Sequence, residues 1–169
     1  MFNRKTIRIQ GYNYKSNGYY FVTCCTENRL LLFGQIKNGK MHLNDAGLMV
    51  QTKIANTPHY YPDVYIDIFI VMPDHFHAVV VLDGQGRTQR SAPTDVGIAD
   101  VVKNIKTYTT THYIQGVRKN NWNPFYKRLW QRGYHEHIIR NENDLNRIRE
   151  YIVNNPLQWH LDKTNVNEF

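Results

Sequence analysis

The fold of this chain is decided by one stretch, Val71-Met72-Pro73-Asp74-His75-Phe76-His77-Ala78-Val79-Val80-Val81-Leu82. The apolar runs at residues 69–72 and 79–82 are short and β-branched, and a Pro-Asp pair separates them, which predicts two buried strands joined by a turn. Side chains alternate between the two faces of a strand. We therefore expect His75 and His77 on one face and the phenylalanine between them on the other, toward a core.

Two imidazoles on one face of a buried strand are a natural pair of metal ligands. Two ordinary hydrogen-bonded histidines have the same spacing. The pattern alone therefore does not distinguish a metal site from a structural pair, and residues from elsewhere in the chain are needed to decide.

The composition is that of a folded, basic protein. The 169 residues are enough for one domain with a core, and 41% hydrophobic and 13% aromatic residues exclude general disorder. The formal net charge of +7 favours a polyanionic partner, nucleic acid before membrane. A soluble basic protein with no special partner would have the same charge, so that alternative stays open.

The two cysteines, Cys24 and Cys25, are adjacent in an expected strand and face opposite ways, which would strain a disulfide between them. We expect two small buried residues in a reducing compartment. The first residues contain no apolar signal-peptide core, and no run approaches the roughly 20 apolar residues that span a bilayer. The expectation is a soluble, cytoplasmic protein that does not contact a membrane.

The order of the expected elements predicts the fold class. Strands are expected at residues 19–26, 64–72 and 134–140 besides the histidine strand, with a hairpin-like turn at Asn38-Gly39. Helices are expected from Asn44 or Asp45 to about residue 56, ended by Pro58 and Pro62; from about Ile98 onward; and from Asn141 or Asn143 to residues 154–156. This predicts a single α+β domain over residues 1–169, with a ferredoxin-like antiparallel or mixed sheet and helices on one face.

Basic residues concentrate in the second half of the chain. A mobile surface loop is expected at about residues 83–97, which are rich in Gly, Ser, Pro and Gln. Residues 116–133 interleave basic and aromatic side chains, which suits single-stranded nucleic acid, because its bases stack and its phosphates pair with cations. A satellite hydrophobic cluster with a solvated basic face is the alternative. The candidate DNA-binding residues are Arg87, Arg90, Lys103, Lys106, Lys119, Lys127, Arg128 and Arg132.

The last expected helix supplies a second half for the site. Tyr151 and Asn155 are four residues apart and so share a helical face. A phenol can act as a nucleophile, and an amide oxygen is an acceptable hard ligand beside imidazole. Taken singly, a core aromatic residue and a normal Asn-Pro helix terminator explain both positions. Their combination with two histidines on one face and a basic surface is what indicates chemistry.

This combination resembles the single-tyrosine HUH transposases of the IS200-like family. In that family a His-hydrophobic-His strand binds a divalent metal, and one helical tyrosine cuts single-stranded DNA. The resemblance covers most of the chain, from Tyr20-Phe21-Val22-Thr23 through Met72-Pro73-Asp74-His75-Phe76-His77 to the C-terminal block. The strings Trp130-Gln131-Arg132, His137-Ile138-Ile139-Arg140-Asn141 and Tyr151-Ile152-Val153-Asn154-Asn155-Pro156 resemble the branch of REP-associated tyrosine transposases.

The resemblance implies a metal-dependent endonuclease and strand transferase. Such an enzyme nicks and rejoins hairpin-flanked single-stranded DNA through a 5′-phosphotyrosine, as in transposition. It implies that His75, His77 and Asn155 bind Mg²⁺ or Mn²⁺ and that Tyr151 is the nucleophile. The expected partner is single-stranded or hairpin DNA. Insertion-sequence relatives are dimers with exchanged tyrosine helices, whereas the REP-associated branch resembles monomers, so a monomer is favoured and a homodimer is the alternative.

Other assignments compete with this one. A second His-x-His string, His135-Glu136-His137, lies on another expected strand with less apolar flanks; we prefer the first pair and expect His137 to support the site or contact DNA. A non-catalytic ferredoxin-like module whose exposed sheet aromatics stack bases is the alternative function. A replication or mobilisation relaxase is a third, which we disfavour because such proteins often have extra domains.

Overall fold

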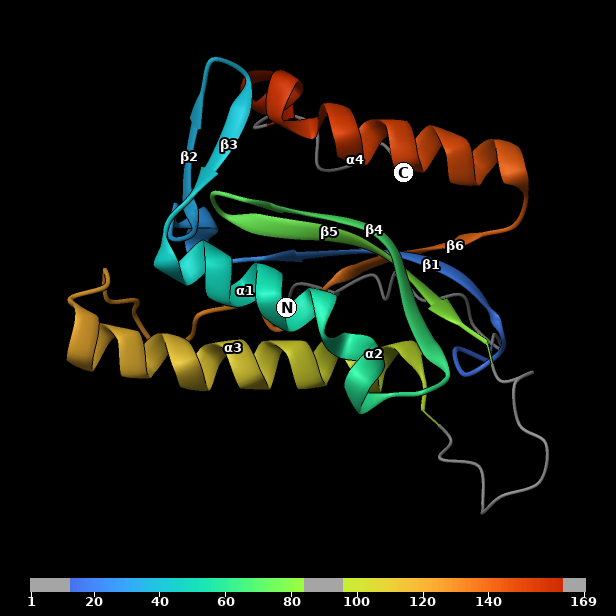
Figure 1. Cartoon of the computed structure of the whole chain (residues 1–169), viewed down its shortest axis with the longest axis horizontal. Coiled ribbons are helices and arrows are strands. Elements are labelled where there is room, and N and C mark those ends of the chain that lie inside the picture. The colour runs from blue at the N-terminus through green and yellow to red at the C-terminus, as the bar shows by residue number, and fades with distance from the viewer. Residues whose placement is uncertain (1–12, 84–95, 163–169) are drawn as a thin grey trace, which may run out of the picture.

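The structure is a computed structural model that describes residues 13–83 and 96–162. At its centre lies a four-stranded antiparallel sheet in the order β4-β5-β1-β6 (Figure 1). Its strands are β1 (Gly18–Cys25), β4 (Val64–Met72), β5 (His75–Leu82) and β6 (His135–Ile139). A short hairpin, β2 (Gly34–Lys37) with β3 (Lys40–Leu43), stands apart from it. The helices are η1 (Glu27–Arg29), α1 (Asp45–Ala55), α2 (Thr57–Tyr60), α3 (Ile98–Asn120) and α4 (Glu142–Asp162).

The connectivity confirms the predicted fold class. The chain runs β1-α1-β4-β5-α3-β6, and the two middle strands of the sheet are the first and third of these four, which is the ferredoxin-like arrangement. The order follows from the buried runs, since β1 and β5 contain the longest unbroken buried stretches and take the centre. None of the helices within residues 13–83 and 96–162 is long and apolar enough to cross a membrane.

The expectation that all helices lie on one face is wrong. α1 and α3 cover one face of the sheet, and α4 lies across the opposite face (Figure 1). The physical reason is that the second face is also apolar: Phe21, Val79 and Ile139 project from it. Burying such side chains is favourable by roughly 1.5–3 kcal/mol each. Leu145 and Ile148 belong to the helical side of the same cluster.

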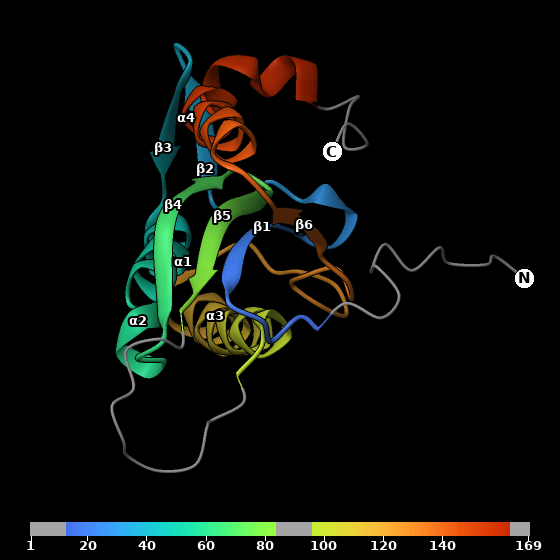
Figure 2. The same ribbon diagram turned by 90° about the vertical axis from the view of Figure 1, so that its right-hand side faces the viewer.

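The last helix does not end at Asn154-Asn155-Pro156 but continues through Pro156 to Asp162. Proline lacks the N–H for the preceding turn and crowds the helical backbone, so it bends a helix that packing holds together. In Figure 2 the red C-terminal turns of α4 run in a different direction from its orange first part. Trp159, one turn beyond the proline, is buried in the protein.

Several local predictions are confirmed and one is not. Asn38 and Gly39 take left-handed φ values of 50° and 69°, as a tight hairpin turn requires. Asn44 caps α1, because its side chain accepts a hydrogen bond from the backbone of Gly47 at 2.9 Å. Pro58 does not terminate a helix; it sits in the first turn of α2, where a missing N–H costs nothing.

We expect α4 to contribute its apolar face to stability. Ile148→Ala should lower the free energy of unfolding by about 2–5 kcal/mol, because the side chain is fully buried between the helix and the sheet. Val153→Ala on the same helix should change it by less than about 0.5 kcal/mol, since that side chain is 64% exposed. Urea unfolding of both variants tests this. Equal effects would mean that α4 is not packed on the sheet.

Candidate active site

His75 and His77 lie at the start of β5, directly after the turn that joins β4 to β5. Both side chains are on the α4 face of the sheet and are 2% and 5% exposed, whereas Phe76 points into the opposite core. The register of β1 against β5 puts Cys25 opposite His75 and Thr23 opposite His77. The predicted alternation of the histidine strand is therefore confirmed.

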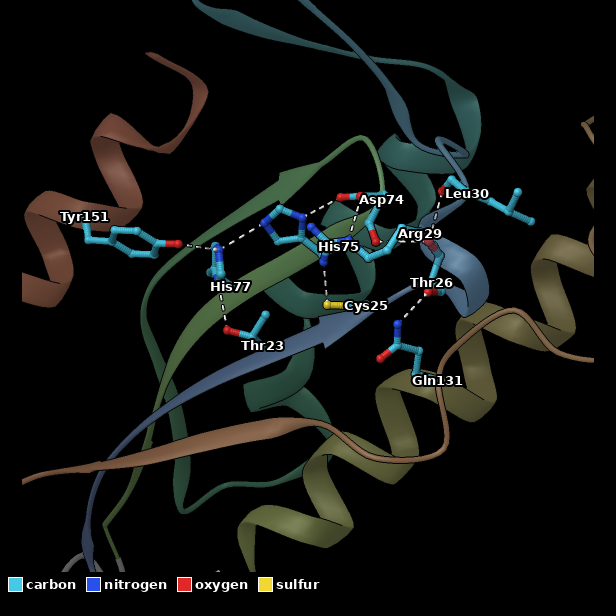
Figure 3. Close-up of polar contacts among 10 residues, drawn as sticks. All are labelled: Thr23, Cys25, Thr26, Arg29, Leu30, Asp74, His75, His77, Gln131 and Tyr151. Carbon is cyan, nitrogen blue, oxygen red and sulfur yellow. Dashed lines mark hydrogen bonds and ion pairs between the residues drawn. The ribbon is translucent and has the colours of Figure 1, made fainter. Parts of the chain in front are cut away.

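A buried carboxylate orients His75. Nδ1 of His75 lies 2.6 Å from Oδ1 of Asp74, and the other carboxylate oxygen lies 2.9 Å from Nε of Arg29 (Figure 3). A carboxylate only accepts hydrogen bonds, so Nδ1 carries the proton. The nitrogen that remains for other partners is Nε2.

His77 is held by a hydroxyl group instead. Its Nδ1 lies 2.7 Å from Oγ1 of Thr23, and its ring stacks on Phe21 with the ring centroids 5.3 Å apart. Burial, together with the neighbouring charges of His75 and Arg29, holds the pKa of His77 well below its ordinary value. Burial therefore favours the neutral form of His77.

The two rings face each other through their Nε2 atoms, which are 3.0 Å apart. Two lone pairs at that distance repel, so a proton or a cation has to lie between or beside them. The geometry makes the pair a candidate cation site, in addition to a hydrogen-bonded pair.

One face of α4 covers the histidine pair. Oη of Tyr151 lies 3.5 Å from Nε2 of His77, and the ring of Trp159 stacks on His75 at a centroid distance of 6.0 Å. Asn155 is one helical turn from each of them and is fully buried. Asn155 thus lies on α4 between Tyr151, which contacts His77, and Trp159, which contacts His75. Figure 3 shows Tyr151 pointing from α4 toward His77.

Ion pairs fix α4 against the sheet at its first half. Arg149 binds both carboxylate oxygens of Asp67 on β4, at 2.6 and 2.8 Å. Asp144 lies 2.7 Å from Nε2 of His137 on β6; burial raises its pKa, but the bonds to His137 and Arg147 outweigh burial and leave the pKa below its ordinary value. The tyrosine helix thus docks on the sheet of its own chain.

The competing string His135-Glu136-His137 does not reach the pair. β6 is separated from β5 by β1, and His137 lies opposite Phe21 and binds Asp144. Within the described residues no cluster of three or more His, Cys, Asp and Glu side chains has the geometry of a metal site. Among these four residue types in the described part of the chain, a metal at the histidine pair would therefore have the two imidazoles as its ligands.

The aromatic residues of the segment after α3 belong largely to the core. Trp122 and Phe125 pack against Tyr113, and Trp130 is buried against Phe33. Tyr126, at 73% exposed, is the aromatic residue that this segment presents to solvent. The alternative of a satellite hydrophobic cluster thus describes most of these rings.

The candidate DNA-binding residues are placed differently from one another. Lys103, Lys119, Lys127 and Arg132 are exposed. Lys106 donates to the backbone oxygens of Gln131 and Gly133, at 2.6 and 3.1 Å, and so ties that segment to α3. Nε of Arg128 lies 3.9 Å from Oε1 of Glu27. Arg87 and Arg90, like most of the expected loop at residues 83–97, lie outside the described residues.

Sequence reasoning missed Arg29, Thr23 and Trp159 as parts of the site. Thr23 could have been found by pairing the two expected central strands in register. Trp159 follows the four-residue spacing of Tyr151 and Asn155, but the expected helix end hid it. No residue pattern around Arg29 indicates that it belongs to the site. Both cysteines are free and buried as expected, and burial raises the pKa of Cys24 to about 12.

Known proteins have similar sequences. A family model described as "Transposase IS200 like" matches residues 14–155, which include both histidines, Tyr151 and Asn155. An uncharacterized protein of Haemophilus influenzae is 37% identical over 176 residues, covering 97% of this chain and 94% of its own length. A second protein of that organism, provisionally named a REP-associated tyrosine transposase, is 27% identical over 149 residues, which cover 86% of this chain and 74% of that protein.

A solved structure has the same fold. It is that of a REP-associated tyrosine transposase bound to a REP hairpin, and it superimposes with a TM-score of 0.60 at 23% identity, over 90% of this chain and 74% of its own. The family match extends over most of the described elements, from before β1 into α4. This chain therefore belongs to the IS200-like transposase family.

Proposed function

We propose that this transposase is a metal-dependent single-stranded DNA endonuclease and strand transferase that acts through Tyr151. One observation carries the proposal. A tyrosine hydroxyl meets a pair of convergent imidazole nitrogens on one face of the sheet, with Oη of Tyr151 3.5 Å from Nε2 of His77. The buried Asn155 lies one helical turn from Tyr151 on the same helix. A nucleophile beside a cation site is what transesterification of a phosphodiester requires.

The donor set fits a divalent cation. Two nitrogens bound at right angles to one ion at about 2.1 Å are about 3.0 Å apart, and the two Nε2 atoms are separated by 3.0 Å. His75, His77 and Asn155 would hold the ion, with Asp74 and Thr23 orienting the two rings. When bound, Mg²⁺ or Mn²⁺ would polarise the scissile phosphate and favour the ionised phenol of Tyr151.

The proposed reaction is a transesterification in which the phenol of Tyr151 is the nucleophile. Oη of Tyr151 loses its proton and forms a bond to phosphorus, and the bond from phosphorus to the 3′-oxygen of the preceding nucleotide breaks. That oxygen takes up a proton and leaves as a 3′-hydroxyl, while the 5′-phosphate stays on Tyr151. Because the energy of the phosphodiester is kept in the covalent bond, a 3′-hydroxyl can reverse the step and rejoin strands without a nucleotide cofactor.

The proposed substrate is single-stranded DNA flanked by a hairpin. The solved relative with the same fold is bound to a REP hairpin. The net charge of +7 supports a polyanionic substrate. Lys103, Lys119, Lys127 and Arg132 remain the proposed phosphate contacts among the described residues. Lys106 and Arg128 already bind the backbone oxygen of Gln131 and the carboxylate of Glu27, so they can bind a phosphate only in addition to these partners.

We further propose that the active form is a monomer in which Tyr151 serves the histidines of its own chain. The bidentate pair of Arg149 with Asp67 and the pair of His137 with Asp144 hold α4 over the same chain's site. A homodimer with exchanged helices would have to break these pairs and form them between chains. The two buried free cysteines suit a reducing compartment such as the cytoplasm.

Tyr151→Phe should abolish the covalent DNA adduct and cleavage together, because only the attacking oxygen is lost and water has no equivalent position. Binding of hairpin DNA should be unchanged, since the ring still packs on Phe21 and His77. The measurement is a denaturing gel of labelled hairpin DNA incubated with protein and Mn²⁺. Tyr126→Phe, at an exposed position, is the control. An adduct that persists in Tyr151→Phe would refute the nucleophile, and wild-type protein that binds but never forms an adduct would indicate the non-catalytic binding module.

Asn155→Ala should weaken Mn²⁺ binding by about tenfold to a hundredfold, a range typical for residues that support a metal site. Asn154→Ala is a matched control, because it removes the neighbouring amide, which is half-buried, from the same helical turn. Calorimetric titration of both variants with Mn²⁺, without DNA, measures the effect. Equal affinities in the two variants would remove Asn155 from the ligand set.

A further inference from the structure

The loop between β1 and β2, residues 26–33, has an unusual backbone next to the histidine pair. Asn28 and Arg29 are consecutive and both adopt left-handed φ values, 55° and 56°. Residues other than glycine rarely take this conformation, and a side chain as long as that of arginine gains nothing from it locally. Such strain persists only when the surroundings enforce it, and it gathers at functional sites.

The surroundings enforce it by fixing both ends of the loop to the turn between β4 and β5. Oγ1 of Thr26 donates to the backbone oxygen of Leu30 at 2.9 Å and lies 3.1 Å from that of Asp74. At the other end the backbone nitrogens of Leu32 and Phe33 both donate to the oxygen of Pro73, at 2.8 and 3.0 Å. The loop is therefore a rigid part of the site and not a free connection.

This conformation places the guanidinium of Arg29 at the edge of the site. Nε pairs with Asp74 and Nη1 donates to Sγ of Cys25 at 2.7 Å, so two of its nitrogens are held by the protein. The side chain is still 31% exposed. The exposed part of the guanidinium can bind a phosphate oxygen from outside while Nε stays paired with Asp74.

The same loop turns two leucines outward. Leu30 is 37% exposed and Leu31 is 54% exposed, although the residues that follow them are buried. Beside the loop lies the segment with the exposed Tyr126, since the backbone of Glu27 donates to Leu129 at 2.9 Å. Apolar and aromatic side chains next to cations are the combination that unpaired bases and their phosphates select.

The loop lies where a strand leaving the site would pass. In Figure 3 the residues follow one another from Tyr151 through His77 and His75 to Asp74, Arg29 and Leu30, so the loop is on the side of the histidine pair away from Tyr151. In an in-line displacement the leaving oxygen departs on the side opposite the attacking one. With the scissile phosphate at the cation site of the proposed function, a strand cut by Tyr151 would leave on the side of Arg29.

We propose that the loop at residues 28–31 is a contact surface for single-stranded DNA next to the scissile phosphate, with Arg29 binding a phosphate and Leu30 and Leu31 packing against unpaired bases. The location beside the cut rests on the proposed function. The binding itself does not, because it needs neither the metal nor cleavage. If the loop served only to bring Arg29 to Asp74, substitutions of the exposed leucines would not change DNA binding.

The test compares two leucines of similar exposure. Leu31→Ser should weaken binding of a short fluorescein-labelled oligothymidylate by about threefold to tenfold, which is less than the loss of an aromatic stacking contact, because leucine offers no ring to a base. Leu48→Ser on α1, where the side chain is 48% exposed, should bind as the wild type does. Fluorescence anisotropy in EDTA measures both, and thermal unfolding confirms that each variant is folded. Wild-type affinity in Leu31→Ser, or equal losses in the two variants, would overturn the proposal.

Arg29→Gln provides a readout that a structural role would not move. Losing one phosphate contact should reduce the slope of log affinity against log salt by about 0.7 for a single strand. If Arg29→Gln does not fold, the comparison of Leu31→Ser with Leu48→Ser still tests the proposed DNA contact. Loss of oligothymidylate binding in Leu31→Ser by a protein that forms no adduct would support the surface while refuting the nickase.

Discussion

The site depends on the pairing of the buried Asp74 carboxylate with His75 and Arg29. The carboxylate of Asp74 is 4% exposed and joins His75 on one side to Arg29 on the other. A buried carboxylate without both partners would cost several kcal/mol. Its backbone oxygen accepts the N–H of Thr26, so the same residue ties the end of β1 to the turn before β5. One residue thus fixes the tautomer of His75, the position of Arg29 and the meeting of two strands.

The second constraint is that the sheet is buried on both faces. The face toward α1 and α3 holds the larger apolar cluster, with Val22, Phe76 and Ile105 among its members. The face toward α4 holds a smaller one, and its remaining positions are occupied by polar groups such as Thr23 and His77. The larger cluster on the α1 and α3 face contributes most of the apolar burial. The α4 face can therefore hold polar side chains at positions that would otherwise be apolar.

The local part of this arrangement could be predicted from the sequence. The bounds of β4, the turn at Asn38-Gly39 and the cap at Asn44 follow from residue types within a few positions of one another. The shared face of His75 and His77 follows from the period of a strand. These features are set by backbone sterics and by hydrogen bonds between near neighbours, which a sequence displays directly.

The remainder depends on contacts between distant segments. That α4 covers the second face follows from the apolar side chains of three different strands together, and no single strand reveals it. Arg29 meets Asp74 only after β1 pairs with β5. Trp122 and Trp130 belong to the core because α3 and the end of β1 lie beside them. An interleaved basic and aromatic pattern cannot distinguish such rings from a stacking surface, because both uses require the same residues and differ only in what packs against them.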